Sequence, residues 1–171
     1  QMDSHLPTLT VKEALMISAS LRYDASDAER KRSVNKVLKQ LHLENIQNQL
    51  IGTPGLDGIA PEARKLTTIG VELVCCPKVL FLDEPTTGLD SSSALATMQL
   101  AKSVAKVNGI AVLCTIHQPA SEIFELFDTL LLLQKGGRPA YFGLTSLMNN
   151  YFVNQCGANP MEEGTNPADY S

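Results

Sequence analysis

Residues 79–90 read VLFLDEPTTGLD, and this stretch decides the fold. It opens on an apolar run, which is typical of a strand that is buried on both faces of a parallel sheet. The run ends in two adjacent acids, Asp83 and Glu84, and a turn with Pro and Gly leads to a third acid, Asp90. Because an unpaired buried carboxylate is costly, the pair predicts a cation, a partner or solvent where this strand ends.

The segments on either side of this stretch predict an α/β fold. We expect fully buried strands at residues 78–82 and 110–116. Between them a helix is expected at residues 90–107, with Asp90 as its N-cap and a glycine as its stop. Strand–helix–strand alternation is typical of a mainly parallel sheet, in which ligands bind at the carboxyl ends of the strands. His117 is expected at the same edge of the sheet as the paired acids.

Other segments predict helices before the first strand and a hairpin after the second. Two capping-box patterns predict helix starts, TVKE at residues 10–13 and SDAE at residues 26–29. A turn-rich break at residues 52–58, GTPGLDG, precedes a third helix that is expected at about residues 61–75. The remaining predicted elements are a short helix, two strands around a Gly-Gly turn and a last helix, at residues 119–127, 129–143 and 145–156.

The composition excludes some classes of function. The formal net charge is −4, so the basic excess that is typical of a nucleic-acid surface is missing, and no nucleic-acid partner is expected. The longest apolar stretches, such as residues 109–116, are too short to span a bilayer.

The paired acids suit a phosphate-bound magnesium ion. Mg²⁺ takes oxygen ligands and keeps several waters, so one carboxylate holds it directly or through water. The neighbouring Glu84 would then orient or deprotonate an attacking water, and His117 would hydrogen-bond a terminal phosphate. A structural alternative is that the acids only cap the turn and the following helix, and that the histidine is a structural residue.

Several motifs carry a resemblance to ATP-binding cassette (ABC) ATPases. The Walker B motif and D-loop are similar to residues 79–90, and the switch-histidine loop is similar to TIHQP at residues 115–119. The segment after the Q-loop in the G subfamily of ABC transporters is similar to residues 1–15, QMDSHLPTLTVKEAL. ARKLTTIGVEL at residues 63–73 and NPADY at residues 166–170 also resemble that subfamily.

The resemblance implies part of a P-loop NTPase (ABC ATPase) domain. Residues 1–76 would form the Q-loop and a helical signature subdomain, and residues 77–171 the C-terminal part of a RecA-like core with a mainly parallel sheet. The phosphate-binding Walker A loop, G-x-x-x-x-G-K-[ST], does not occur in the sequence. We therefore expect a fragment, the C-terminal two-thirds or so of a nucleotide-binding domain, that by itself would neither bind ATP tightly nor hydrolyse it.

The family's signature, Leu-Ser-Gly-Gly-Gln, is altered here to IAPEA at residues 59–63. An intact signature uses a serine hydroxyl and N–H groups at a helix N-terminus to grip the γ-phosphate of ATP on a partner cassette. Ala60 has no hydroxyl, Pro61 has no N–H, and Glu62 adds a negative charge, while Ala63 completes the degenerate motif. Proline and glutamate still suit a first helical turn, so we expect the helix to survive and the phosphate grip to be lost.

The resemblance implies roles for individual residues in a site that uses ATP and Mg²⁺. Gln1 would be the Q-loop glutamine that contacts magnesium or water, and Asp83 would ligate magnesium. Glu84 would be the general base, and His117 would contact the γ-phosphate. Asp90 would reach across the interface to a second cassette.

The resemblance also implies a function and partners. The intact protein would hydrolyse ATP to export small hydrophobic or drug-like compounds or lipids. The altered signature resembles the second cassette of full-length pleiotropic drug resistance transporters. Its partners would be another cassette, stacked head to tail, and a transmembrane domain of the same polypeptide, with this domain on the cytoplasmic side of the membrane. Two alternatives stay open: a soluble ABC ATPase that acts on ribosomes or DNA, and a non-catalytic nucleotide-binding module that regulates another protein.

Overall fold

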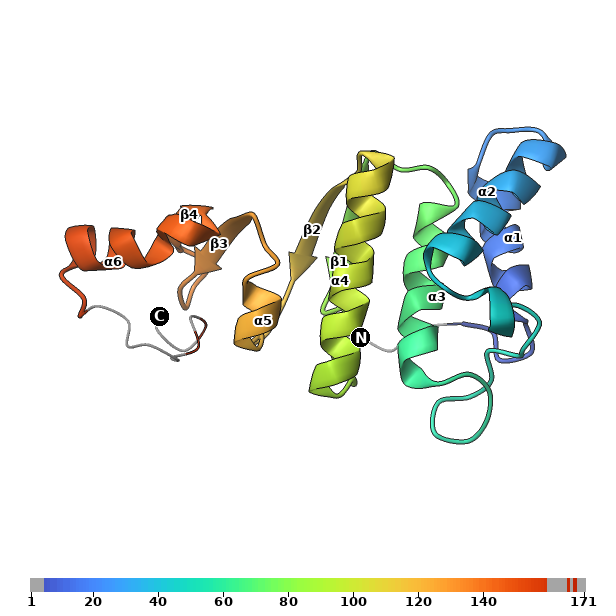
Figure 1. The fold of residues 1–171 in the computed structure, drawn as a ribbon, viewed down its shortest axis with the longest axis horizontal. Helices are drawn as coiled ribbons and strands as arrows, with labels where there is room; N and C mark the ends of the chain where they lie inside the picture. The colour runs from blue at the N-terminus through green and yellow to red at the C-terminus, as the bar shows by residue number, and fades with distance from the viewer. Residues whose placement is uncertain (1–4, 160–165, 167, 169–171) are drawn as a thin grey trace. The chain divides into compact units, whose positions relative to one another are not determined.

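A computed structural model describes residues 5–159, 166 and 168 (Figure 1). The chain divides between Ile116 and His117 into two compact units, and each is described by itself. The division predicted from the sequence, at residues 76/77, separates a helical part from the strands within the first unit and stays a prediction.

The first unit begins with three helices that lie side by side in Figure 1 and contribute to its core. The elements are α1 (Val11–Arg22), α2 (Asp27–Gln40), the 3₁₀ turn η1 (Glu44–Ile46) and α3 (Pro61–Leu73). Both predicted capping boxes are confirmed: the side chains of Thr10 and Ser26 accept hydrogen bonds from the N–H groups of Glu13 and Glu29, whose carboxylates accept in return. Large side chains from all three helices are fully buried against one another: Val11, Leu15, Val34, Leu38 and Ile69.

The predicted break at residues 52–58 is a tight loop that places the start of α3. Gly58 has a φ of +89°, and a Cβ there would lie 2.1 Å from the carbonyl oxygen of Ile51. Only glycine tolerates this backbone conformation and this close approach. The loop is closed by Thr53, whose N–H donates to the carboxylate of Asp57 over 2.6 Å.

The second half of the first unit is a strand–helix–strand segment. Strands β1 (Val79–Asp83) and β2 (Ala111–Thr115) pair in parallel, with Asp83 opposite Thr115. Between them runs α4 (Ser91–Asn108), which is capped by Asp90 at its start and by Gly109, at a φ of 65°, at its end. The predicted order and the parallel pairing are therefore confirmed.

The prediction that both strands are buried on both faces is wrong for this chain. Leu80 and Leu82 are buried in the same core as the helices, but Phe81 on the other face is 70% exposed. On β2, Leu113 is 58% exposed. An apolar run predicts that other elements pack against both faces of a strand, but it does not show which residues these are. Here the helices of the first unit cover one face.

The second unit is a hairpin with short helices. Its elements are α5 (Ser121–Phe124), β3 (Thr129–Leu133), β4 (Pro139–Leu144), η2 (Thr145–Leu147) and α6 (Met148–Cys156). The strands are antiparallel around Gly136 and Gly137, both of which have positive φ, as predicted. The first helix, at Ser121–Phe124, is shorter than the predicted span of residues 119–127, and its N-cap Ala120 provides no side-chain hydrogen bond. The unit's small core is built on Phe124, Tyr141 and Met148.

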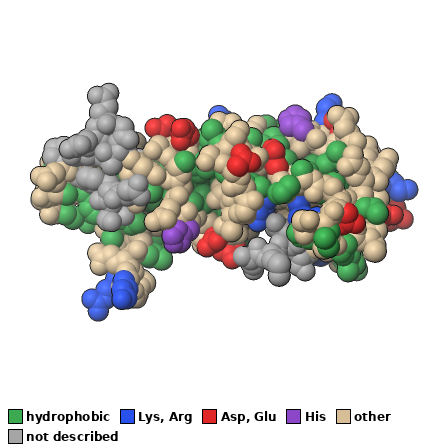
Figure 2. All heavy atoms as spheres, turned by 90° about the horizontal axis from the view of Figure 1, so that it is seen from below, with side chains coloured by type: hydrophobic (Ala, Val, Ile, Leu, Met, Phe, Trp, Pro, Cys, Tyr) green, Lys and Arg blue, Asp and Glu red, His purple; other side chains and the backbone are tan. Residues whose placement is uncertain are grey.

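The surface carries mixed charge. On the face shown in Figure 2, acidic and basic side chains are scattered among apolar and polar ones. Within the described residues, no helix combines the length and the apolar character that crossing a membrane requires.

Candidate functional site

Asp83 and Glu84 stand at the carboxyl end of β1, as predicted. Asp83 is the last residue of the strand, and its side chain is exposed. Glu84 has a φ of 46°, a left-handed conformation that is uncommon for a residue other than glycine. Such strain persists only where surrounding contacts impose it, and it is frequent at functional sites.

Contacts with β2 hold the paired acids. The N–H of Glu84 donates to both the carbonyl oxygen and the Oγ1 of Thr115, each over 3.1 Å. The same hydroxyl donates to Oδ1 of Asp83 over 2.7 Å. The chain therefore leaves β1 along the end of β2, and both acids lie beside the last residue of that strand.

The residues after Glu84 form a turn that orients its carboxylate. Thr87 donates twice to Glu84, from its hydroxyl to Oε2 over 2.9 Å and from its N–H to the carbonyl oxygen over 3.1 Å. Gly88 follows with a φ of 83° and turns the chain into α4. The alternative that the acids have a structural role in the turn is therefore correct in part, because Glu84 organises the turn. One of its carboxylate oxygens accepts no hydrogen bond from the described residues.

Asp90 caps α4. Its Oδ1 accepts hydrogen bonds from the N–H groups of Ser92 and Ser93 over 3.0 and 3.1 Å. A hydrogen bond from the side chain of Ser93, followed by those from the N–H groups of Ser93 and Ser92, holds the pKa of the Asp90 carboxyl below its ordinary value. The predicted N-cap is confirmed, and a contact of Asp90 with a second cassette stays a prediction.

Two predicted site residues are not joined to this group. His117 is exposed and belongs to the second compact unit, so its place beside Glu84 stays a prediction. Gln1 lies outside the described residues, and its role also stays a prediction.

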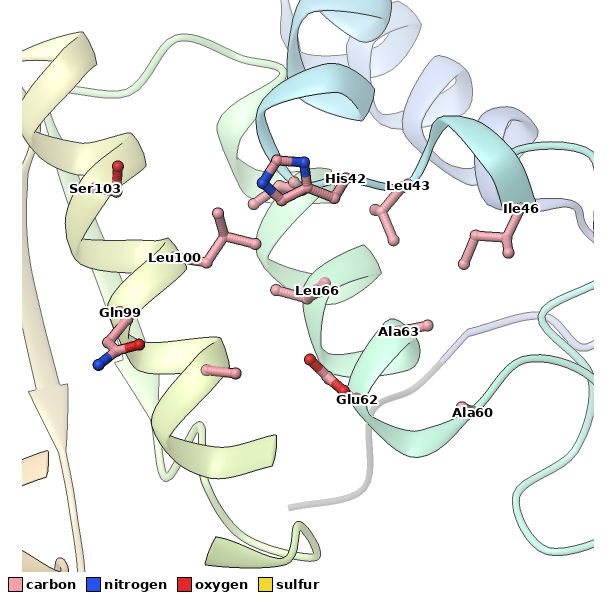
Figure 3. Close-up of a pocket in the computed structure, with 12 residues that line it drawn as sticks. His42, Leu43, Ile46, Ala60, Glu62, Ala63, Leu66, Gln99, Leu100 and Ser103 are labelled. Carbon is pink, nitrogen blue, oxygen red and sulfur yellow. The ribbon is translucent and has the colours of Figure 1, made fainter. Parts of the chain in front are cut away.

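The altered signature opens α3, as expected. Ala60 is the N-cap and makes no side-chain capping bond, Pro61 is the first helical residue, and Glu62 lies in the first turn. The survival of the helix is therefore confirmed, and the loss of its phosphate grip stays a prediction. Figure 3 shows the Glu62 carboxylate directed into the space between α3 and α4.

That space is a cavity of about 580 Å³ with a largely apolar wall. Ala60, Glu62 and Ala63 line it on the α3 side, and Gln99 and Leu100 line it on the α4 side (Figure 3). Glu62 is the sole Asp, Glu, Lys or Arg among its lining residues. The carboxylate of the altered signature therefore faces a pocket within its own unit.

Sequence reasoning missed two residues that position these groups. Arg64 is 6% exposed and donates to the carbonyl oxygens of Ile51 and Gly52 over 2.7 and 3.1 Å, which fixes the loop before α3. The position of this arginine shortly after a turn-rich segment is the signal from which its role in fixing the loop could have been predicted. Thr115 was missed because its role depends on the register of two distant strands.

The chemistry of the acids fits magnesium that is held mainly by phosphate and water. No group of three His, Cys, Asp or Glu side chains within the described residues could hold a metal ion. Mg²⁺ bound to nucleotide phosphates needs only one or two protein carboxylates. Asp83 offers one, since its second oxygen accepts no hydrogen bond from the described part of the chain.

Comparison with solved structures identifies the fold. The chain superimposes on cbiO1 of Clostridium perfringens, described as part of the ABC transporter complex cbiONQ, with a TM-score of 0.71 at 21% identity. The match covers 91% of this chain and 61% of that one. The chain therefore shares its fold with part of that protein, which confirms the expected fold of a partial ABC ATPase domain.

The sequence relatives of the chain are ABC transporters. ABC transporter G family member 43 of Arabidopsis thaliana is 43% identical over 99% of this chain. G family member 14 of Dictyostelium discoideum and the ABC-type transporter eriD of Hericium erinaceus are each 45% identical, also over 99%. A family model described as "ABC-2 type transporter" matches residues 117–171. Over nearly its whole length the chain is therefore similar to members of the G family of ABC transporters, and it spans only 12–13% of the length of these relatives.

Proposed function

We propose that the chain is part of an ATP-hydrolysing cassette that powers export across a membrane. The observation that carries this proposal is the pair of acids at the carboxyl end of β1, tied to β2 by Thr115, in a chain that is similar to G family transporters. Similarity to G family transporters supports transport, and the acids could supply a magnesium ligand and a base for the hydrolysis of a phosphate bond. The proposed cargo is a small hydrophobic or drug-like compound or a lipid.

Each acid has a distinct task in this proposal. Asp83 would hold Mg²⁺ through the carboxylate oxygen that Thr115 leaves free, and the ion would neutralise charge on the transferred phosphate. Glu84 accepts a proton from, or orients, the attacking water through the carboxylate oxygen that Thr87 leaves free. Thr87 limits the rotation of that carboxylate, which favours a fixed position for the water.

Three further residues complete the proposed site in the intact protein. His117 would contact the γ-phosphate and keep the water in line with Glu84. Gln1 would contact magnesium or water and respond to the transmembrane partner. Asp90 would approach a second cassette while its Oδ1 caps α4.

The altered signature makes the proposed pair of nucleotide sites unequal. Residues 59–63 would face ATP on the other cassette and hold it weakly, because Ala60 and Pro61 remove a hydroxyl and an N–H and Glu62 adds a like charge. The cassette would itself hydrolyse the ATP that its partner's signature grips. This arrangement corresponds to the second cassette of a full-length pleiotropic drug resistance transporter, with a transmembrane domain in the same polypeptide and this domain on the cytoplasmic side.

Replacement of Glu84 by Gln in the intact protein tests the proposal. The amide keeps the size of the side chain but accepts no proton, so ATP hydrolysis should fall by about 100-fold or more, while ATP still binds. Glu44→Gln is the matched control, because Glu44 is exposed in η1, and its side chain makes no hydrogen bond within the described residues.

The outcomes separate the proposal from its alternatives. Unchanged hydrolysis in Glu84→Gln, with ATP bound, would contradict a catalytic site here and support the regulatory module. Lost hydrolysis together with unchanged transport of lipophilic compounds into membrane vesicles would keep the ATPase and reject the export function.

A further inference from the structure

We propose that Thr115 is a positioning residue that holds both acids of the site in place. This inference rests on the function proposed above. Thr115 ends β2 and lies opposite Asp83 in the parallel register. Its hydroxyl is therefore at the carboxyl edge of the sheet, next to the end of β1.

The hydroxyl of Thr115 uses its donor on one acid and an acceptor on the other. It donates to Oδ1 of Asp83 over 2.7 Å and accepts from the N–H of Glu84 over 3.1 Å. A threonine hydroxyl has one donor and two acceptor positions, so both bonds form at the same time. No other side chain within the described residues hydrogen-bonds both Asp83 and Glu84, since Thr87 reaches only Glu84.

The bond to Asp83 has a consequence for metal binding. A carboxylate on an exposed side chain samples several orientations, and ordering it costs entropy when the metal arrives. Thr115 removes part of that cost in advance by fixing Oδ1, which leaves the second oxygen in a defined direction.

The bonds to Glu84 have a consequence for the position of its side chain. The φ of 46° at Glu84 needs contacts that impose it. Thr115 provides two of these contacts, through its carbonyl oxygen and its hydroxyl oxygen. Loss of the hydroxyl leaves the hydrogen bond to the carbonyl oxygen in place. The left-handed conformation of Glu84 should therefore be less strongly held but still present.

The shape of threonine also matters. Its branched Cβ limits the χ1 rotamers in a strand, so the hydroxyl is held toward the neighbouring strand. Valine keeps that shape and lacks the hydroxyl, whereas serine keeps the hydroxyl and lacks the branch. The two substitutions therefore separate the hydrogen bonds from the packing.

The test compares Thr115→Val with Thr115→Ser in the intact protein. The first readout is binding. ATP should raise the Tm in the presence of Mg²⁺, and the readout is the Mg²⁺ concentration at which this rise is half of its maximum. The second readout is the rate of ATP hydrolysis at saturating Mg²⁺. Thr129→Val is the matched control, because Thr129 is exposed at the start of β3 and its hydroxyl makes no hydrogen bond within the described residues.

Thr115→Val should raise the half-maximal Mg²⁺ concentration by about tenfold or more, as expected for the loss of a hydrogen bond to a charged group. Its ATPase rate should also fall by about tenfold or more, while Thr115→Ser should stay within about threefold of the unchanged protein in both readouts. Valine suits an exposed strand position, and circular dichroism checks that the variant is folded.

Two results would overturn the inference. Thr115→Val with an unchanged Mg²⁺ requirement would show that the hydroxyl does not act through Asp83. Equal losses in the valine and serine variants would show that packing, and not the hydroxyl, is responsible. If Glu84→Gln abolishes hydrolysis while Thr115→Val changes nothing, only this inference fails, whereas unchanged hydrolysis in Glu84→Gln contradicts the proposed function itself.

Discussion

Asp90 illustrates at the residue scale how one carboxylate serves a local task that can be measured. It accepts hydrogen bonds from Ser92 and Ser93 at the start of α4, where free N–H groups and the helix dipole favour negative charge. The pKa of Asp90 is lowered in the folded protein, chiefly by Ser93. A lowered folded pKa means that the charged cap stabilises the fold above the unfolded pKa, about 3.9. That contribution is lost as the pH falls through the folded pKa.

We predict that Asp90→Ala lowers the Tm by a few degrees at pH 7, because α4 loses its N-cap. The difference in Tm from the unchanged protein should shrink as the pH falls from 5 towards 2, since the wild-type cap becomes protonated in that range. Thermal unfolding across this pH series checks the prediction. Asp24→Ala is the control, because Asp24 is exposed before α2 and forms no cap. A difference in Tm that is independent of pH would contradict the role of the charge.

At the scale of the element, the sequence predicted what depends on local contacts. The boxes at residues 10–13 and 26–29 place the starts of α1 and α2, because each cap is made by residues three apart. The turn at residues 136–137 and the N-cap of α4 are predictable for the same reason.

Contacts between distant segments were not predictable. The exposed face of β1, with Phe81 at 70% exposure, depends on which helices cover the sheet. The role of Thr115 depends on the register that puts it opposite Asp83, which a single strand does not encode. For the same reason the paired acids could be predicted as a site, while the residue that holds them could not.

Gly70 in α3 marks where the three helices approach closely. A Cβ at this position would lie 3.1 Å from Cδ1 of Leu41 and within 3.5 Å of Val37 and Leu15. Alanine favours a helix over glycine by about 1 kcal/mol, whereas overpacking a core costs about 1–3 kcal/mol. Because Leu41 is fully buried, it has little room to move, so the steric cost should exceed the gain.

We therefore predict that Gly70→Ala lowers the free energy of unfolding of the helical core by about 1 kcal/mol. Hydrogen exchange of the α3 amides measures this change. Leu41→Ala removes the side-chain atoms that the new methyl group meets, so Gly70→Ala should cost less, or stabilise, in that background. Stabilisation of the unchanged background by Gly70→Ala would show that the three helices are less tightly packed than the distances indicate.

At the scale of the whole molecule, the two units differ in the size of their cores. The first unit buries apolar side chains from α1, α2, α3, β1 and α4 in one cluster. The second unit has three buried residues in its cluster, Phe124, Tyr141 and Met148. Since burial of apolar area is the main stabilising term, the second unit should open more readily.

Tyr141 is the residue on which the second unit's stability most depends. It is 7% exposed, its hydroxyl donates to the carbonyl oxygen of Leu144 over 2.7 Å, and its ring centroid lies 5.1 Å from that of Tyr151. Truncation of a buried aromatic residue costs about 3–5 kcal/mol, which is large for so small a core. We predict that Tyr141→Ala accelerates amide hydrogen exchange in β3, β4 and α6 by about 100-fold or more, with no change in α1–α3. Tyr151→Ala is the control: Tyr151 is 39% exposed, so its loss should accelerate exchange much less. Equal acceleration in the helices of the first unit would mean that the two units unfold together, and the division of the chain at Ile116 would then describe its geometry but not its energetics.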